Sequence, residues 1–275
     1  MGTLENKVAI VTGAGRGIGR AIAKKLASES ARVVVNDLDA APAQETVDAI
    51  HQKGGKAIAY AGNITEPDFG ERIVKATVDT YGGFDILINN AGYTWDNVIQ
   101  KMTDEQWQAI LDVHLTAPFR LLRAASEFIR SAAKQEAAAG QEVFRKVVNI
   151  SSISGLCGIA GQVNYAAAKA GIVGVTKALS KEWGRYKVNV NCVAFGFINT
   201  RLTESSAAGD ATIEVEGRKI KVGVNQEMHA AMERLIPLGR TGTVEEAAGA
   251  IYLLCLPEAN YISGETVVCA GGFML

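Results

Sequence analysis

Short runs of β-branched and other apolar residues alternate along the chain with longer segments whose apolar positions recur at helical spacing. The apolar runs are predicted to be strands, at Lys7–Thr12, Val33–Asn36, Lys56–Tyr60, Asp85–Asn89, Lys146–Ile150, Asn189–Val193 and Thr266–Cys269. Helices are predicted at Gly17–Ser30, Pro42–Lys53, Asp68–Tyr81, Glu105–Lys134, Val163–Tyr186 and Val244–Leu256. Strands that are apolar throughout and alternate with helices are typical of a parallel sheet covered on both faces. The sequence therefore predicts an α/β fold, a single doubly wound domain over residues 1–275 with about seven parallel strands.

Residues 203–235 interrupt this alternation. Within them, Thr212–Glu216 and Lys219–Val222 alternate apolar and charged residues around Gly217-Arg218, a pattern that predicts a small β-hairpin. An excursion of this length inside a compact domain is either a lid over a site or a surface loop without regular structure. We expect a substrate lid, because of where the segment lies relative to the chemistry described below.

Composition excludes several classes of function. The chain has 275 residues, 48% of them hydrophobic and 21% charged, and a formal net charge of −1. It therefore has no strong positive field to recruit nucleic acid or an anionic membrane. The first residues do not form a signal peptide, and no apolar run approaches the ~20 residues of a membrane span. The four cysteines are scattered without metal-ligand spacing: Cys157, Cys192, Cys255 and Cys269. We expect a cytoplasmic protein without a metal site.

One short spacing points to catalytic chemistry. Tyr165 and Lys169 are four positions apart in a predicted helix, so their side chains share one face. A free tyrosine has a pKa of about 10, which a neighbouring ammonium lowers toward the range that suits general acid–base catalysis. Ser152, thirteen positions before the tyrosine, can donate a hydrogen bond to the same substrate oxygen. The alternative is that Tyr165 and Lys169 are only solvated side chains on an exposed face.

A glycine-rich segment joins the first predicted strand to the first helix. Its sequence, Thr12-Gly13-Ala14-Gly15-Arg16-Gly17-Ile18-Gly19, has the spacing GxxxGxG and not GxGxxG. Glycines here allow a tight turn and a close backbone approach, and the N-terminus of the next helix offers N–H groups to a diphosphate. We therefore assign the segment to a dinucleotide site, with a plain turn as the alternative. The assigned residues are Gly13, Gly17, Ile18 and Gly19.

Two charged residues bear on the choice of cofactor. Asp37 ends the second predicted strand, where a carboxylate can bind the ribose hydroxyls of the adenosine and repel a 2′-phosphate. Arg16 is the opposing signal, because its guanidinium can pair with such a phosphate; otherwise it is a solvated charge at the rim of the loop. We weigh Asp37 above Arg16 and predict NAD, with NADP as the less favoured cofactor.

Taken together, five motifs in this order resemble the short-chain dehydrogenase/reductase family over nearly the whole chain. They are the Thr12–Gly19 loop, Asn89-Asn90-Ala91-Gly92, Asn149-Ile150-Ser151-Ser152, the pair Tyr165 and Lys169, and the pattern from Pro237-Leu238-Gly239-Arg240 through Ile262-Ser263-Gly264 to Gly271-Gly272. Among the branches of the family, the chain most resembles the 3-oxoacyl-thioester reductases. The resemblance implies a Rossmann-type fold and a homotetramer or homodimer paired through the long helices.

The resemblance also implies a role for each residue of the site. Tyr165 is the acid/base, Lys169 lowers its pKa and holds the nicotinamide ribose, and Ser152 orients the substrate carbonyl. Asn63 and Ile64 are implied in binding adenine. Asn90, Ala91 and Gly92 are implied in lining the adenosine side of the cofactor, and Ile198 and Thr200 in holding the nicotinamide carboxamide.

The chain departs from the family at two positions. His114 stands where the family has an asparagine that anchors a water between the lysine and bulk solvent. A histidine both donates and accepts hydrogen bonds, so His114 can anchor such a relay water; the alternative is a buried histidine bonded to a backbone carbonyl. Phe195 replaces a proline near the nicotinamide, and its ring either covers the nicotinamide or packs in the core.

These residues predict an oxidoreductase that transfers a hydride between NAD(H) and a secondary alcohol/ketone pair. The expected substrate is a 3-hydroxyacyl or 3-oxoacyl thioester, and no nucleic acid or membrane partner is expected. Two alternatives stay open. One is a non-catalytic dinucleotide-binding sensor or inactive subunit, and the other is a dehydrogenase of another small hydroxy compound.

Overall fold

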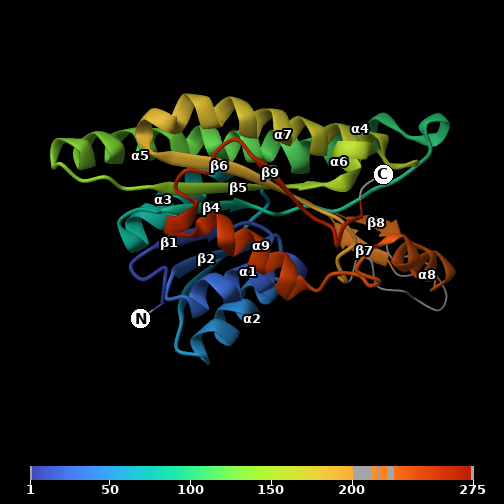
Figure 1. Ribbon diagram of the computed structural model, residues 1–275, viewed down its shortest axis with the longest axis horizontal. Helices are drawn as coiled ribbons and strands as arrows, with labels where there is room; N and C mark the ends of the chain where they lie inside the picture. Colours follow the sequence, from blue (N-terminus) through green and yellow to red (C-terminus); the bar gives the residue numbers. More distant parts are fainter. Residues whose placement is uncertain (1, 201–211, 216, 222–225, 274–275) are drawn as a thin grey trace.

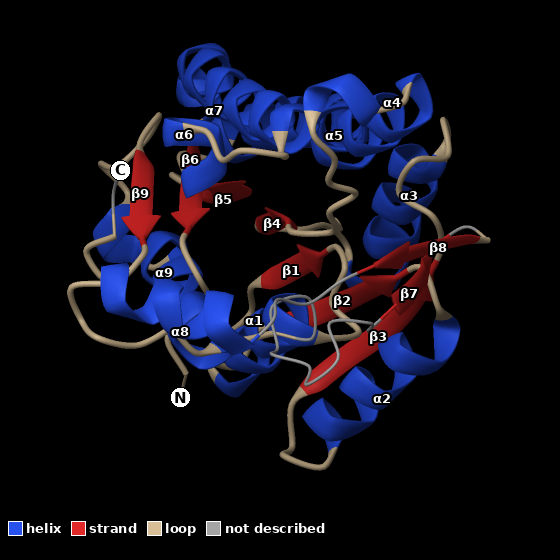
Figure 2. Ribbon diagram, turned by 90° about the vertical axis from the view of Figure 1, so that its right-hand side faces the viewer, coloured by secondary structure: helices blue, strands red, loops and turns tan. Residues whose placement is uncertain are grey.

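The computed structural model describes residues 2–200, 212–215, 217–221 and 226–273. Seven strands pair in parallel in the order β3-β2-β1-β4-β5-β6-β9. Figure 2 shows β3 at one edge of this sheet and β9 at the other. The strands are β1 Val8–Val11, β2 Arg32–Asp37, β3 Lys56–Ala61, β4 Ile86–Asn89, β5 Arg145–Ser152, β6 Val188–Phe195 and β9 Thr266–Cys269. The predicted α/β sheet is confirmed.

Helices cover both faces of the sheet, so its central strands are buried on both sides. One face carries α1 (Gly17–Ser28), α2 (Ala40–His51) and α9 (Val244–Cys255), and the other carries α3 (Phe69–Tyr81), α5 (Ala117–Ala138) and α7 (Val163–Trp183). Figure 1 shows the two layers on opposite sides of the strands. The residues of β1, β4 and β6 are all buried between them.

The order of the strands places the candidate residues together. From β1 the chain winds outward to β3, and from β4 it winds the other way to β9, so the switch point lies between β1 and β4. Ligands bind in such folds at the carboxyl ends of the strands beside the switch point. The glycine-rich loop follows β1 and Asn90 follows β4, and both therefore lie at this place.

The predicted helix Glu105–Lys134 is divided in the structure. It consists of α4 (Asp104–Leu111), one π-helical turn (Asp112–Thr116) and α5. A capping box between Thr103 and Gln106 starts α4. Two helices were not predicted, α6 (Ile153–Cys157) and α8 (Gln226–Leu235), and short 3₁₀ turns lie at Ile99–Lys101, Gly184–Tyr186 and Pro257–Ala259.

The hairpin expected within residues 203–235 is present. Strands β7 (Thr212–Val215) and β8 (Arg218–Lys221) pair antiparallel, with Val215 opposite Arg218. Gly217, between the strands, has a φ of 75°, which a glycine adopts without strain. Residues 201–211, 216 and 222–225 lie outside the described residues. The function of the segment as a lid, and the single-domain division of the chain, stay predictions.

Candidate active site

Tyr165 lies in the first turn of α7, where a buried asparagine fixes the start of the helix. The side chain of Asn164 accepts the N–H of Tyr165 at 2.8 Å and donates to the carbonyl oxygens of Trp95 and Gln106. These bonds join α7 to α4 and to the loop after β4. The sequence did not predict this function of Asn164, because its full burial and its partners are decided by the tertiary structure.

Lys169 lies one turn further along α7, as its spacing predicts. Its Nζ is 5.5 Å from the centre of the Tyr165 ring and donates to the carbonyl oxygen of Ile150 at 2.8 Å. Ser151 donates to the carbonyl oxygen of Lys169 at 2.7 Å, so β5 and α7 are bonded at this point. The side chain is only 3% exposed, and this burial lowers the pKa of Lys169 to about 8.

The structure changes the expected electrostatics of Tyr165. Burial raises the pKa of its phenol to about 12, and a hydrogen bond with the Ser152 side chain acts in the opposite direction. Ser152 ends β5, and its Oγ also accepts the N–H of Ser154 at 3.2 Å. The pKa of Tyr165 is therefore raised and not lowered, with removal from water as the largest cause and Ser152 as the group that acts against it; the effect of Lys169 on this pKa stays a prediction.

His114 lies in the π-helical turn before α5. Its Nε2 is 2.7 Å from the carbonyl oxygen of Tyr93, so this nitrogen carries the proton and donates. Nδ1 is buried and has no hydrogen-bond partner among the described residues. Burial and the charge of Lys169 hold the pKa of His114 well below its usual range, and the imidazole is therefore neutral. The backbone bond expected for a structural histidine is present, and Nδ1 is the one atom that remains for a relay.

Phe195 packs in the core. The side chain is 5% exposed and belongs to the apolar cluster beneath α1 and α9, together with Ile150, Val193 and Ile198. In the sheet it pairs with Ser152 of β5 and Cys269 of β9. Of the two interpretations of this residue, the structure supports packing in the core.

The glycine-rich loop forms an open cradle beside this site. Gly13 and Gly17 have φ values of 62° and 51°, which side chains rarely adopt. A Cβ on Gly13 would lie 2.6 Å from Cα of Ala91, so the loop packs closely on the segment after β4. Among the described residues, the atom nearest to a Cβ on Gly17 is Cγ2 of Thr200, at 4.0 Å.

The N-terminus of α1 begins in this cradle. No described side chain caps α1, whose N-cap residue is Arg16. The N–H groups of its first turn and the helix dipole therefore face the space that the glycines leave open. A dinucleotide diphosphate fits this donor set.

Asn90 holds the loop in place. Its Nδ2 donates to the carbonyl oxygens of Thr12 and Gly13 at 2.9 and 3.1 Å. Thr12 Oγ1 accepts the N–H groups of Asn90 and Ala91 at 3.0 and 3.1 Å. The side-chain amide of Asn90 is thus bonded to the loop, a function that the sequence did not indicate for either Asn90 or Thr12.

Carboxylates surround the edge where adenosine is expected. Asp37 ends β2, and its Oδ2 accepts the N–H of Gly15 at 2.9 Å. The guanidinium of Arg16 is 4.0 Å from Asp39, and both side chains are exposed. Asp37, Asp39 and Arg16 therefore all lie at or near the glycine-rich loop.

The remaining predicted cofactor residues lie around the same loops. Asn63 follows β3, and its Oδ1 accepts from the backbone and hydroxyl of Thr65. Ile64 packs at the rim of two apolar clusters. Ile198 is 5% exposed and belongs to the same apolar cluster as Phe195, and its backbone forms a β-bridge with Gly242.

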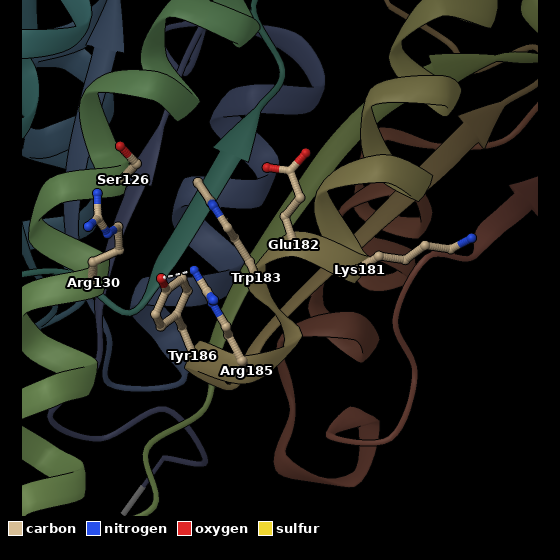
Figure 3. Close-up of a pocket in the computed structure, with 7 residues that line it drawn as sticks. All are labelled: Ser126, Arg130, Lys181, Glu182, Trp183, Arg185 and Tyr186. Atoms are coloured by element: carbon tan, nitrogen blue, oxygen red, sulfur yellow. Dashed lines mark hydrogen bonds between the residues drawn. The ribbon is translucent and has the colours of Figure 1, made fainter.

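A charged hollow lies away from these residues. Arg130 and Ser126 of α5 line it together with Lys181, Glu182 and Trp183 of α7, as Figure 3 shows. Arg185 donates to the hydroxyl of Tyr186 at its lower rim. None of the residues predicted from the sequence to form the site lines this hollow. In the part of the chain that the structure describes, no three His, Cys, Asp or Glu side chains are placed to hold a metal, and no helix is long and apolar enough to cross a membrane.

Comparison with known proteins identifies the class. The short chain dehydrogenase family matches residues 7–211. The chain is 39% identical to the 3-oxoacyl-[acyl-carrier-protein] reductase of Vibrio cholerae over 99% of both chains, and 35% identical to that of Escherichia coli over 98% of both. A solved short-chain dehydrogenase/reductase variant from Serratia marcescens is 27% identical and superposes with a TM-score of 0.83, covering 99% of this chain and 100% of that chain.

The protein belongs to the short-chain dehydrogenase/reductase family. It is an oxidoreductase that transfers a hydride between a nicotinamide dinucleotide and an alcohol/ketone pair.

Proposed function

We propose that this enzyme interconverts 3-oxoacyl and 3-hydroxyacyl thioesters, with NAD(H) as the cofactor. The observation that carries the proposal is the convergence of Ser152, Tyr165 and Lys169 beside the glycine-rich loop. It is supported by the names of the Vibrio cholerae and Escherichia coli relatives, which describe reduction of a 3-oxoacyl group on acyl carrier protein. A bound nicotinamide dinucleotide supplies or accepts the hydride.

In this proposal Tyr165 moves the proton and Ser152 orients the oxygen. A phenol whose pKa is raised to about 12 by burial keeps its proton at neutral pH. It can then donate that proton to the ketone oxygen as negative charge develops there. Ser152, which shares a hydrogen bond with Tyr165, donates to the same oxygen. Lys169 stabilises the phenolate that remains and holds the ribose hydroxyls.

We assign to Lys169 and His114 the function of returning a proton to Tyr165 after each turnover. The neutral imidazole keeps Nδ1 as an acceptor while Nε2–H is bonded to Tyr93. A water held at Nδ1 would link Lys169 to solvent. His114 is in this sense a positioning residue, and its ring packs on Tyr165.

The preference for NAD rests on Asp37. Its carboxylate lies at the loop edge with Asp39, where it would bind ribose hydroxyls and repel a 2′-phosphate. The assigned cofactor residues, from Gly13 and Gly17 to Ile198 and Thr200, are part of the same proposal.

Assembly and location complete the proposal. Homotetramer or homodimer formation through α5 and α7, which lie side by side as the outer layer in Figure 1, is the expected quaternary structure. A cytoplasmic location is expected from the sequence, and an acyl-thioester partner from the family resemblance. The segment 203–235 would close over the substrate as a lid.

The test is a rate measurement with purified protein. NADH loss is followed with acetoacetyl thioester and with a panel of simple ketones. Activity on the thioester, and a loss of about 10²-fold or more in Tyr165→Phe with unchanged NADH binding, are expected. NADH binding without turnover of any carbonyl would favour the sensor or inactive-subunit alternative. Turnover of simple ketones alone would favour a dehydrogenase of a small hydroxy compound.

A further inference from the structure

The β7–β8 hairpin lies against the helices that carry the candidate catalytic residues. Ile220 of β8 is 1% exposed and packs in an apolar cluster with Ile110 of α4, Val113 of the π turn and Ala168 of α7. Tyr165 lies at the edge of the same cluster. Figure 1 shows β7, β8 and α4 at the same end of the molecule.

The hairpin has one apolar face and one charged face. Val215 and Arg218 are opposite one another, and Ile220, two positions on, shares their face. Val215 is half-buried and packs against the rim of this cluster, as Trp95 and Tyr165 also do. Glu214 and Lys219, which point to the other face, are exposed. The inserted segment therefore turns its apolar side toward the site.

Arg218 fastens the hairpin in this position. Its Nε donates to Glu105 in the first turn of α4 at 2.9 Å, and its guanidinium carbon is 5.6 Å from the centre of the Trp95 ring. The carboxylate of Glu105 compensates the charge of Arg218, which argues against recognition of an anionic substrate group. The hydrogen bond joins the insertion to α4, and the contact with Trp95 joins it to the loop after β4.

We propose that Val215 and Trp95 form an apolar wall of the substrate site, anchored by Ile220 and fastened by Arg218, and that this wall selects substrates with a hydrocarbon chain on the carbonyl carbon. The inference rests on the proposed function and specifies its substrate class. When the carbonyl oxygen of the substrate lies at Tyr165, a hydrocarbon chain that extends along this side leaves water and contacts Val215 and the indole ring of Trp95. A short substrate does not extend to the wall and gains nothing from it.

The test compares two 3-oxoacyl thioesters of N-acetylcysteamine, one with an acetoacetyl group and one with a long unbranched chain. Val215→Ser is expected to lower kcat/KM for the long substrate by about tenfold and to change that for acetoacetyl thioester by less than about twofold. Arg218→Ser is expected to act in the same direction. Glu214→Ser and Lys219→Ser, on the charged face, are the matched controls and are expected to leave both substrates unaffected.

NADH binding and the circular dichroism spectrum show whether each variant is folded. Equal losses for both substrates in Val215→Ser and Arg218→Ser, or equal effects in the control variants, would overturn the assignment of the wall while leaving the thioester activity intact. Wild-type protein that binds NADH but reduces neither thioester would overturn the proposed function itself.

Discussion

The imidazole of His114 meets the phenol of Tyr165 edge to face, with ring centres 5.0 Å apart and ring planes at 89°. The contact places a neutral, buried histidine directly beside the group proposed to carry the proton. The Nε2–H bond to the Tyr93 carbonyl fixes the orientation of the imidazole. His114, one of the two departures from the family pattern, is thus packed on Tyr165, the proposed acid/base.

Replacement of His114 separates the relay from simple packing. His114→Asn keeps an amide that can donate to the Tyr93 carbonyl and hold a water, and is expected to retain most of kcat. His114→Leu leaves that buried carbonyl unpaired, at a cost of about 1–3 kcal/mol, and cannot hold the water. We expect it to lose most of kcat while NADH binding is kept, as measured by steady-state kinetics and fluorescence titration. Near-normal turnover in the leucine variant would rule out the relay.

Gly92 is predicted to be intolerant of a side chain. A Cβ at this position would lie 2.7 Å from Nδ1 of His114, closer than real Cβ contacts. Gly92→Ala should therefore displace the imidazole, lower the free energy of unfolding by about 1–3 kcal/mol and reduce turnover. Gly249→Ala in α9 is the control, because among the described residues no atom lies within 4 Å of its Cβ. That variant should gain about 0.5–1 kcal/mol in urea unfolding. Equal stability in the two variants would contradict the prediction.

The lowered pKa of Lys146 predicts that the free energy of unfolding depends on pH. Its Nζ donates to Asn189 and Asn260 at 2.9 and 2.7 Å, and burial lowers its pKa from 10.5 to about 8. Below pH 8 the folded and unfolded chains both hold the proton, and the contribution is constant. Between pH 8 and 10.5 the folded chain loses the proton while the unfolded chain keeps it, so stability rises with pH.

The measurement for Lys146 is a difference in the free energy of unfolding between wild type and Lys146→Met. The pKa of Lys169 is also lowered, but Lys169 is present in both proteins, so its contribution cancels in the difference between the two free energies of unfolding. The stability of wild type relative to the variant is expected to increase from pH 8 to 10.5. A flat or falling difference over that window would show that the folded chain does not lower the pKa of Lys146.

Asp37 is predicted to set the cofactor preference. Asp37→Ser removes the negative charge that a 2′-phosphate would meet, and should raise kcat/KM for NADPH relative to NADH by about tenfold or more. Arg16→Ala, which removes the guanidinium 4.0 Å from Asp39 that could pair with a 2′-phosphate, should shift the preference further toward NADH. A wild-type preference for NADPH that Asp37→Ser does not change would contradict the assignment.

Much of the fold was predictable because its signals are local. A strand buried on both faces is rich in apolar residues along its length, and an amphipathic helix repeats its apolar positions at helical spacing. The seven strands and the six predicted helical regions follow from these two patterns. The division of α4 and α5 by a π turn was missed, because the apolar periodicity of the segment does not distinguish one π turn from continuous α-helix. Helix α8 was not predicted, because residues 203–235 were interpreted as a single lid segment.

The candidate site shows the same division. The i, i+4 spacing of Tyr165 and Lys169 and the position of the glycines at the end of β1 are properties of the sequence, since helix and turn geometry are local. The partner of His114, the packing of Phe195, the bonds from Asn90 to the loop and the position of the hairpin join residues distant in the chain. The direction of the pKa shift of Tyr165 also depended on the tertiary structure, because burial is the sum of neighbours contributed by every element around it.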